Sequence, residues 1–287
     1  MTTMAVEVLE RADMGTVFKI ARKELKGTIG SRWFWMWVVA FVGLAAVLVM
    51  IALPSSSING HAGFGRTAAS LVTLVQIIIP LMGLALGALS IAGQRESGAM
   101  RFLMSHPISR TEAFWGIYLG HVAALGIAAG AGFGIAGVLT ATRGVSGGTG
   151  PFVWIALVSW VLAVAMLGIG MLISTYAARS GAALGIAVFV WLFFVFIGDL
   201  GLMGTSAATS MPVSVLFGIA LLNPVEAFRL TALTALSGSL DALGPAGIFA
   251  VDTLGDSLGI ALFIVLVLWL AVPALVAWRR FVGKADL

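Results

Sequence analysis

The sequence predicts an all-α integral membrane protein with six transmembrane helices. Of its residues, 60% are hydrophobic and only 10% are charged, and the mean hydropathy is +1.10. A soluble domain of this length would carry about 25% charged residues. Six long runs without Asp, Glu, Lys or Arg each approach the roughly 20 residues that a helix needs to cross a bilayer. We expect spans at 33–53, 68–92, 113–140, 152–176, 181–198 and 258–278.

The basic residues predict the orientation of these spans. If the six spans alternate, 13 of the 16 Lys and Arg residues fall on one side, in both termini, in the loop after span two and in the turn after span four. The other side holds only Arg66, Arg143 and Arg229. Positive charge marks the cytoplasmic side of a membrane protein. We therefore expect a multi-pass protein of the cytoplasmic (inner) membrane with both termini in the cytoplasm, and we take the high isoelectric point as a topology signal, with no nucleic-acid partner.

Sequence motifs for chemistry in this chain itself are missing. It has no cysteine, which excludes disulfides and thiolate metal sites. It has no glycine-rich loop with the Lys-Ser/Thr ending that cradles nucleotide phosphates and no His-Glu-x-x-His metal motif. Within the spans, His121 is the one ionisable residue of the usual kinds. We expect no catalytic residue, no metal site and no cofactor here, so the chain is not an enzyme, and any ATP binds a separate subunit.

The segment 14–32 predicts an N-terminal amphipathic helix at the inner membrane surface. Its apolar residues recur at three- and four-residue spacing, and its basic residues fall on the other face. The apolar set is Met14, Val17, Phe18, Ala21, Leu25 and Ile29. Such a helix either only anchors the chain or also contacts a cytoplasmic partner.

Two spans carry unusual residues. Span two contains Pro80, which predicts a kink that neighbouring helices must cover. Span three carries small residues at every fourth position, which lets helix backbones approach closely in lipid. They are Gly116, Gly120, Ala124, Ala128, Gly132 and Ala136. This pattern serves packing within the chain, a dimer seam or the lining of a narrow conduit.

The loop 94–112, which we call the handle loop, is the most informative stretch. Ala99–Met104 predicts a short helix whose apolar face is Met100, Leu103 and Met104, and Pro107 ends it. Ser109 and Glu112 have the spacing of a capping box that starts span three. A short cytoplasmic helix between two spans is either a coupling helix that a soluble partner can move or an interfacial helix lying on lipid.

The segment 199–257 is the one large extracytoplasmic region. Asn223, Pro224 and Glu226 form a helix start, with a cap, a first-turn proline and an acidic residue near the N-terminus. The sequence therefore predicts short outer helices before the last span.

This pattern resembles the type-2 ABC exporter permeases over nearly the whole chain, 1–287, as a single transmembrane domain. The stretch Gln94–Arg110 is similar to that family's arginine-glutamate-x-glycine and serine-x-proline-x-serine-arginine signature, with Met104 where a second leucine is usual. Leu221–Arg229, Leu243–Gly247 and Ala250–Thr253 further resemble the permease subgroup of nitrous oxide reductase maturation, the Nos system.

The resemblance implies partners and site residues. The partners would be a cytoplasmic ABC ATPase subunit, a second copy of the chain as homodimer, membrane lipid and a periplasmic β-helical protein, in an assembly supporting copper-site construction in the reductase. The expected ATPase-coupling residues are Glu96, Met100, Arg101, Leu103 and Met104. The expected outer docking residues are Asn223, Glu226, Arg229 and Asp241. Export of a drug, lipid or peptide and a purely scaffolding role are the alternatives.

Overall fold

The computed structural model describes residues 13–52, 61–142, 149–208, 213–234 and 252–283. Regular structure in these ranges is helical throughout. The elements are α2 (Met14–Gly30), α3 (Arg32–Ala52), α4 (His61–Glu96), α5 (Ala99–Met104), α6 (Arg110–Thr142), α7 (Thr149–Tyr176), α8 (Ser180–Ala208), α9 (Val213–Leu221), α10 (Pro224–Thr234), the turn η2 (Gly255–Ser257) and α12 (Leu258–Gly283).

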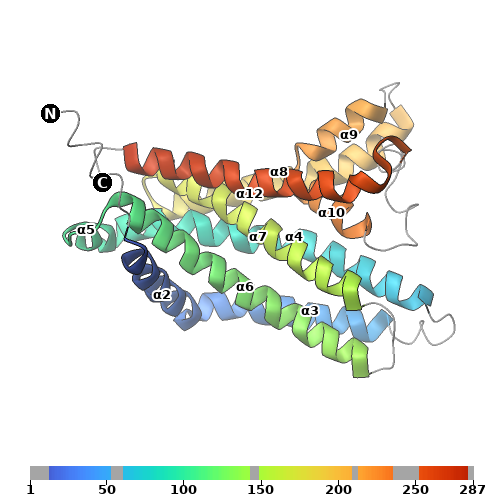
Figure 1. The fold of residues 1–287 in the computed structure, drawn as a ribbon, viewed down its shortest axis with the longest axis horizontal. Helices are drawn as coiled ribbons and strands as arrows, with labels where there is room; N and C mark the ends of the chain where they lie inside the picture. Colours follow the sequence, from blue (N-terminus) through green and yellow to red (C-terminus); the bar gives the residue numbers. More distant parts are fainter. Residues whose placement is uncertain (1–12, 53–60, 143–148, 209–212, 235–251, 284–287) are drawn as a thin grey trace.

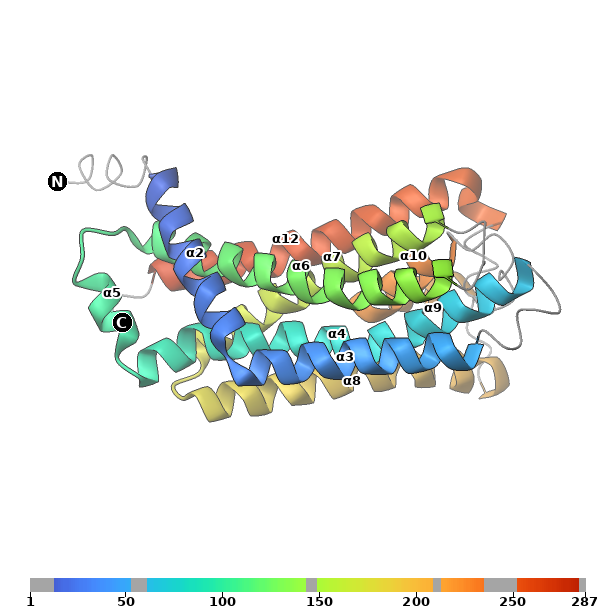
Figure 2. The same cartoon turned by 90° about the horizontal axis from the view of Figure 1, so that it is seen from below.

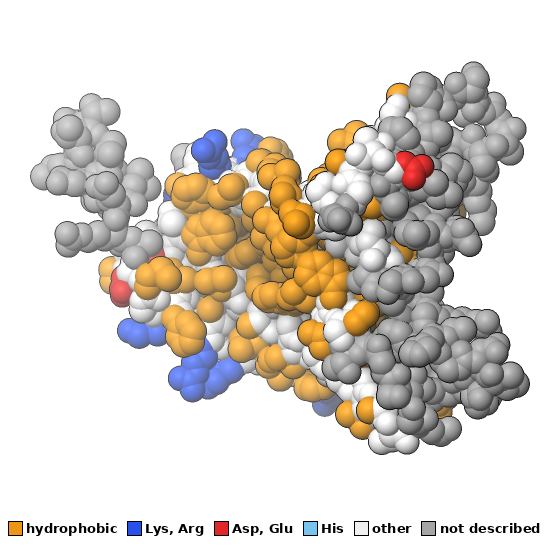
Figure 3. Space-filling view, turned by 45° about the vertical axis from the view of Figure 1, so that its right-hand side comes forward, with side chains coloured by type: hydrophobic (Ala, Val, Ile, Leu, Met, Phe, Trp, Pro, Cys, Tyr) orange, Lys and Arg blue, Asp and Glu red, His pale blue; other side chains and the backbone are white. Residues whose placement is uncertain are grey.

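The long helices run side by side along the longest axis of the molecule (Figures 1 and 2). α2 and α5 lie at one end, where the C-terminal end of α12 also lies, and α9 and α10 lie towards the other. Figure 3 shows a broad cover of hydrophobic side chains, with Lys and Arg gathered away from the α9 side. We call the end that carries α2 and α5 the basic end.

Within the described residues, five helical segments are long and apolar enough to cross a membrane: Arg32–Ile51, Ser70–Glu96, Arg110–Thr142, Gly150–Tyr176 and Leu258–Gly283. Each overlaps a predicted span. The remaining prediction, 181–198, falls on the shorter apolar segment Ser180–Phe196 of α8. The helix itself continues to Ala208, so it extends past the predicted end of that span.

A break at Ser31 separates the N-terminal helix α2 from α3. The backbone of Ser31 is extended, with φ −81° and ψ 128°, and the indole of Trp35 donates to the carbonyl freed at Ile29 (2.7 Å). Asp13 caps the start of α2. Hydrogen bonds from the Thr16 hydroxyl (2.9 Å) and the Gly15 N–H (3.0 Å) hold the pKa of the Asp13 carboxyl below its usual range.

α2 and α3 pack against small residues of α6, the helix that contains predicted span three. These contacts show the role of three positions in its small-residue pattern. A Cβ at Gly116 would lie 2.6 Å from Ile20 Cβ, and one at Gly120 would lie 2.7 Å from the Ala21 carbonyl. Gly132 leaves room for the ring of Phe41 on α3. These three positions therefore serve packing within the chain. The predicted apolar face of α2 divides as a result, because Val17 and Ala21 are buried while Met14 and Phe18 point outward.

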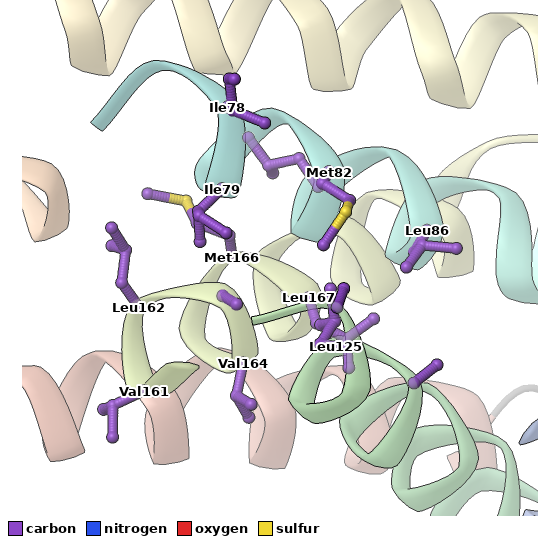
Figure 4. Packing of buried hydrophobic residues seen from close by; sticks show 14 of the residues in the cluster. Ile78, Ile79, Met82, Leu86, Leu125, Val161, Leu162, Val164, Met166 and Leu167 are labelled. Carbon is purple, nitrogen blue, oxygen red and sulfur yellow. The ribbon is translucent and has the colours of Figure 1, made fainter. Parts of the chain in front are cut away.

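The centre of the bundle is the contact between α4 and α7, where the two backbones touch. Gly83 and Gly87 of α4 lie against the backbone of α7, and Gly170 of α7 lies against the backbone of α4 at Leu84 and Ala88. Figure 4 shows apolar side chains from α4 and α7 meeting around this contact, among them Met82, Leu162 and Met166. A Cβ on any of these glycines would force the helices apart.

A serine hydroxyl of α7 also enters the backbone of α4. Ser174 Oγ donates to the Ala88 carbonyl (2.7 Å) and accepts from the Ala92 N–H (2.8 Å), two groups that a regular α-helix would pair with each other. Pro80, further along α4, is buried as predicted, and the Trp191 indole of α8 donates to the nearby Ile77 carbonyl (3.0 Å). The Ser174 hydroxyl thus satisfies the two backbone groups of α4 that it separates, as a lipid environment requires.

Replacing Gly87 with leucine should lower the thermal stability of the detergent-solubilised protein. The new side chain meets backbone atoms of α7, which cannot rotate away, and overpacking of this kind costs about 1–3 kcal/mol or more. The apparent unfolding temperature, followed by fluorescence-detected size exclusion, measures the effect. Gly43→Leu is the matched control, because no atom of the described residues lies within 4 Å of a Cβ there. Equal losses for the two variants would contradict the α4–α7 contact.

Candidate coupling site at the basic end of the bundle

The handle loop begins with a turn that only glycine adopts easily. Gly98 precedes α5 with φ +77°, a left-handed conformation that costs a residue with a Cβ about 1–2 kcal/mol. The turn follows α4 and leads into the six-residue helix α5, the predicted Ala99–Met104. Figure 2 shows α5 projecting at the basic end, beyond the ends of the neighbouring long helices.

The apolar face of α5 is turned towards the protein's own bundle. Met100 is 1% exposed and Leu103 is 9% exposed, both within the hydrophobic core, and Met104 packs half-buried against that core. These are the side chains that the sequence analysis assigned to a partner. In this chain they instead fix α5 to the bundle, because the nearest apolar surface is the end of α4. Arg101 remains exposed.

The outward face of α5 is formed by a residue that the sequence analysis missed. Phe102 is 71% exposed, and its ring lies edge-on to the ring of His106 with centroids 5.0 Å apart. The His106 Nδ1 also lies 3.0 Å from the Phe102 carbonyl oxygen. The available signal was that Phe102 is out of phase with Met100 and Leu103, so a helix cannot bury all three on one face.

The first end of the handle loop is tied to the start of α8. The Glu96 carboxylate accepts hydrogen bonds from the backbone N–H of Ser180 (2.9 Å) and from the Ser180 hydroxyl. Carboxylates are favourable at a helix N-terminus, where N–H groups lack partners inside the helix. Glu96, one of the expected ATPase-coupling residues, thus joins the loops after α4 and after α7.

The second end of the handle loop is tied to the start of α2. Glu112 Oε2 accepts from the Ser109 N–H (2.7 Å), and the Ser109 hydroxyl accepts from the Glu112 N–H (3.2 Å), which confirms the predicted capping box. The other carboxylate oxygen, Oε1, accepts from the backbone N–H of Asp13 (2.7 Å). One buried carboxylate therefore joins the starts of α2 and α6.

Arginines bind the ends of further helices to this region. Arg110 donates to the Val282 carbonyl at the end of α12 (3.3 Å), and Arg280 of α12 lies over the ring of Tyr176 at 4.6 Å. Arg95 donates to the Thr175 carbonyl at the end of α7 (3.4 Å). Cations are favourable beside helix C-termini, where carbonyls lack partners. The handle loop is thus attached to the basic ends of α2, α7, α8 and α12.

The expected outer docking residues lie mostly inside the bundle. Asn223 is 3% exposed: its side chain accepts from the Val225 N–H (2.9 Å) and donates to the Phe194 carbonyl of α8 (2.6 Å). Glu226 is 4% exposed and pairs with Arg229 at 3.5 Å. α10 packs against α4, α7, α8 and α12, and the Asn223 side chain bonds its start to α8. Asp241 lies outside the described residues, and among the four named, only Arg229 has a partly exposed described side chain.

Comparison with known proteins identifies the family. The model of a family described as “ABC-2 family transporter protein” matches residues 18–287. The chain belongs to this family. It is similar to two curated relatives named “Probable ABC transporter permease protein NosY”. The relative from Stutzerimonas stutzeri is 29% identical over 281 residues, which cover 93% of this chain and 98% of that protein. The relative from Pseudomonas aeruginosa PAO1 is 29% identical over 265 residues, covering 89% and 94%.

Family membership gives the geometry a context. The chain is a NosY-like permease of the ABC-2 type, the multi-pass inner-membrane component of an ABC transporter. Such a permease works with an ABC ATPase on its cytoplasmic side. The resemblance drawn from Gln94–Arg110 is therefore confirmed at the level of the family.

Replacing Glu112 with alanine should loosen α2 from the handle loop. The backbone N–H groups of Asp13 and Ser109 lose their charged acceptor, and a hydrogen bond to a charged group contributes roughly 1.5–3 kcal/mol. Limited trypsin digestion should then cut sooner within α2, at Lys19 to Lys26. Glu112→Gln, which keeps one carbonyl acceptor, should give an intermediate rate. Wild-type protection of α2 in the alanine variant would show that this carboxylate does not hold the helix.

Proposed function

We propose that this chain is the membrane subunit of a complex in which a separate cytoplasmic ATPase moves the handle loop and the helices attached to it. In this proposal the basic end faces the cytoplasm, both termini lie there, and α8 crosses the membrane as the sixth span. The excess of Lys and Arg at that end supports the orientation. α5 acts as the coupling helix, and α2 lies at the inner membrane surface.

One observation carries this proposal: the handle loop is rigidly attached to the bundle while its outer face stays open. Glu96 links it to α8, Glu112 links it to α2, and Met100 fixes α5 to the core. A displacement applied at α5 would therefore reach several helices at once. The exposed ring of Phe102, flanked by Arg101 and His106, is the contact we propose for the ATPase. A buried aromatic anchor with a polar rim is the usual composition of such interfaces.

We further propose that the complex contains two copies of this chain and supports copper-site construction in nitrous oxide reductase with a periplasmic partner. Exposed apolar side chains on α3, α6, α8 and α12 provide surface for lipid and for a second copy (Figure 3). Similarity to the two NosY relatives over nearly their full length supports the reductase assignment. The periplasmic protein would dock on the outer segment around Arg229 and Asp241, on a base held by Asn223 and Glu226.

Export of a drug, lipid or peptide is the alternative with the same architecture. An exporter needs a path between helices, whereas α4 and α7 meet backbone to backbone in this chain. That contact favours transmission of movement through the bundle over a path between these two helices. A scaffold without transport or movement is the third option, and it gives no reason for attaching the handle loop at both ends.

Phe102→Asp should release the ATPase during purification of the complex. Hot-spot aromatics contribute about 2 kcal/mol or more to an interface, which corresponds to roughly thirtyfold in affinity. Copurification and titration of the purified ATPase onto the permease in nanodiscs measure the loss. Because Phe102 is exposed, membrane insertion and monodispersity should stay unchanged.

Phe102→Leu is the matched control and should retain most of the affinity. Leu103→Asp is a poorer test, because Leu103 is buried and its loss would disturb the attachment of α5 as well. Full ATPase retention by a correctly inserted Phe102→Asp protein would remove the proposed coupling contact.

The reductase assignment predicts complementation. In a denitrifying host that lacks its own corresponding permease, this chain with its cognate ATPase and periplasmic partner should restore nitrous oxide reduction and the copper content of the purified reductase. The Phe102→Asp variant should restore neither. A reductase that stays copper-deficient with the wild-type chain, although the complex assembles, would favour the exporter alternative.

A further inference from the structure

An open cavity lined by both polar and apolar side chains lies at the basic end, at the junction of α2, α3, α4 and α6, and it borders the first residues of the handle loop (Figure 2 shows this junction). Its volume is about 270 Å³, far above the roughly 10–15 Å³ that one water needs. Its lining includes the carboxylate residue Glu24, the imidazole residue His121 and the amide residue Gln94, with Trp33 and Phe34 as an aromatic wall. Neither the capping network nor the proposed ATPase contact uses it.

The hydrogen bonds around this cavity leave it rich in acceptors. The His121 Nδ1 lies 2.8 Å from the Ile117 carbonyl oxygen, which can only accept, so a neutral imidazole keeps its Nε2 as an acceptor. Two hydroxyls in the lining also donate to backbone carbonyls of their own helices: Thr28 to Glu24 (2.9 Å) and Ser90 to Gly87 (2.7 Å). Their oxygen lone pairs remain available.

Glu24 and Gln94 add a charge and an unmet acceptor. The Gln94 Nε2 donates to Glu24 Oε2 (3.1 Å), and this fixes the amide orientation because a carboxylate only accepts. The Gln94 Oε1 is then buried without a hydrogen-bond donor in the described part of the chain. The Glu24 side chain is 13% exposed, and its other oxygen lies 3.2 Å from the ammonium of Lys23, whose side chain is 63% exposed. Lys23 therefore stands at the surface and leaves the cavity open.

We propose that this cavity binds a primary ammonium group, and that the aminoethyl headgroup of phosphatidylethanolamine supplies it. An ammonium offers three donors and a positive charge to a site composed of acceptors around one carboxylate. Its methylene carbons suit the wall of Trp33 and Phe34, and the lipid phosphate meets the exposed basic residues of α2, Lys23 among them. This inference rests on the proposed placement of α2 at the inner membrane surface and not on the ATPase or reductase assignments.

Other ligands of similar size fit these groups less well. A quaternary ammonium has no N–H to donate to Glu24, His121 or Gln94. Phosphatidylserine brings a second carboxylate next to Glu24, which is repelled. A divalent cation would find one carboxylate and one imidazole, fewer charged ligands than such sites usually offer. The site therefore selects for a primary amine.

Native mass spectrometry of the full-length chain with its ATPase tests this proposal. The complex is exchanged into detergent containing equal amounts of phosphatidylethanolamine and phosphatidylcholine with the same acyl chains. The wild-type protein should retain phosphatidylethanolamine at least about tenfold in preference, the scale of one charge-assisted hydrogen bond. Glu24→Gln should reduce the preference to near equality.

A steric variant keeps the test independent of charge. Gly93 lines the cavity, and in the part of the chain that the structure describes no atom lies within 4 Å of a Cβ there, so Gly93→Leu should fill the space without disturbing the helices. It should lose phosphatidylethanolamine while still binding the ATPase. Gly30→Leu is the matched control, because that position is equally open but does not line the cavity, and it should keep the wild-type preference.

Two results would overturn the proposal. Equal retention of the two lipids by the wild-type protein would exclude recognition of the ammonium, and an unchanged preference in both Glu24→Gln and Gly93→Leu would exclude this cavity as its site. Soluble ethanolamine distinguishes a lipid headgroup from a free amine as the ligand. If ethanolamine displaces the lipid only when it is in large excess, the lipid headgroup is the ligand. If ethanolamine binds tightly in the absence of lipid, the headgroup assignment is refuted. A variant that loses the lipid preference but still binds the ATPase would also show that this inference can be tested independently of the coupling proposal.

Discussion

The backbone contact between α4 and α7 is the constraint on which the rest of the bundle depends. In lipid, apolar side chains gain little by leaving one apolar surface for another, so helices associate through close packing and shared polar groups. Gly83, Gly87 and Gly170 permit that closeness, and the Ser174 hydroxyl converts it into a hydrogen-bonded joint. α10 and α12 then pack on α7, and α8 packs on α4, so each takes its position from this pair.

Carboxylates join helices in a corresponding way at the basic end of the bundle. Glu96 and Glu112 each accept two hydrogen bonds and each connect segments that are about 80 to 100 residues apart in sequence. At a helix start, such a carboxylate satisfies N–H groups that the helix cannot pair itself. The charge therefore stabilises the ends of helices whose apolar middles are positioned by the glycines.

The local features of this architecture could be predicted from the sequence, and its long-range pairings could not. Apolar run length located five spans, and the Ser109–Glu112 spacing located the capping box, because both signals lie within one helix or one turn. The bond from Glu96 to Ser180 and the inward face of α5 depend on which distant segment lies nearest. The burial of Asn223 and Glu226 was missed for the same reason, since a helix start signal is the same at a surface and in a core.

The backbone contact between α4 and α7 and the carboxylate hydrogen bonds of the handle loop together connect that loop to the far end of the protein. α4 has 36 residues, so it reaches roughly 54 Å along its axis, and it begins the handle loop at one end while contacting α10 towards the other. A helix held backbone to backbone with its neighbour moves with that neighbour rather than alone. In the coupling that we propose, a displacement at α5 would travel as a shift of the α4–α7 pair, and the ion pair of Glu226 and Arg229 lies on α10, which contacts both of these helices.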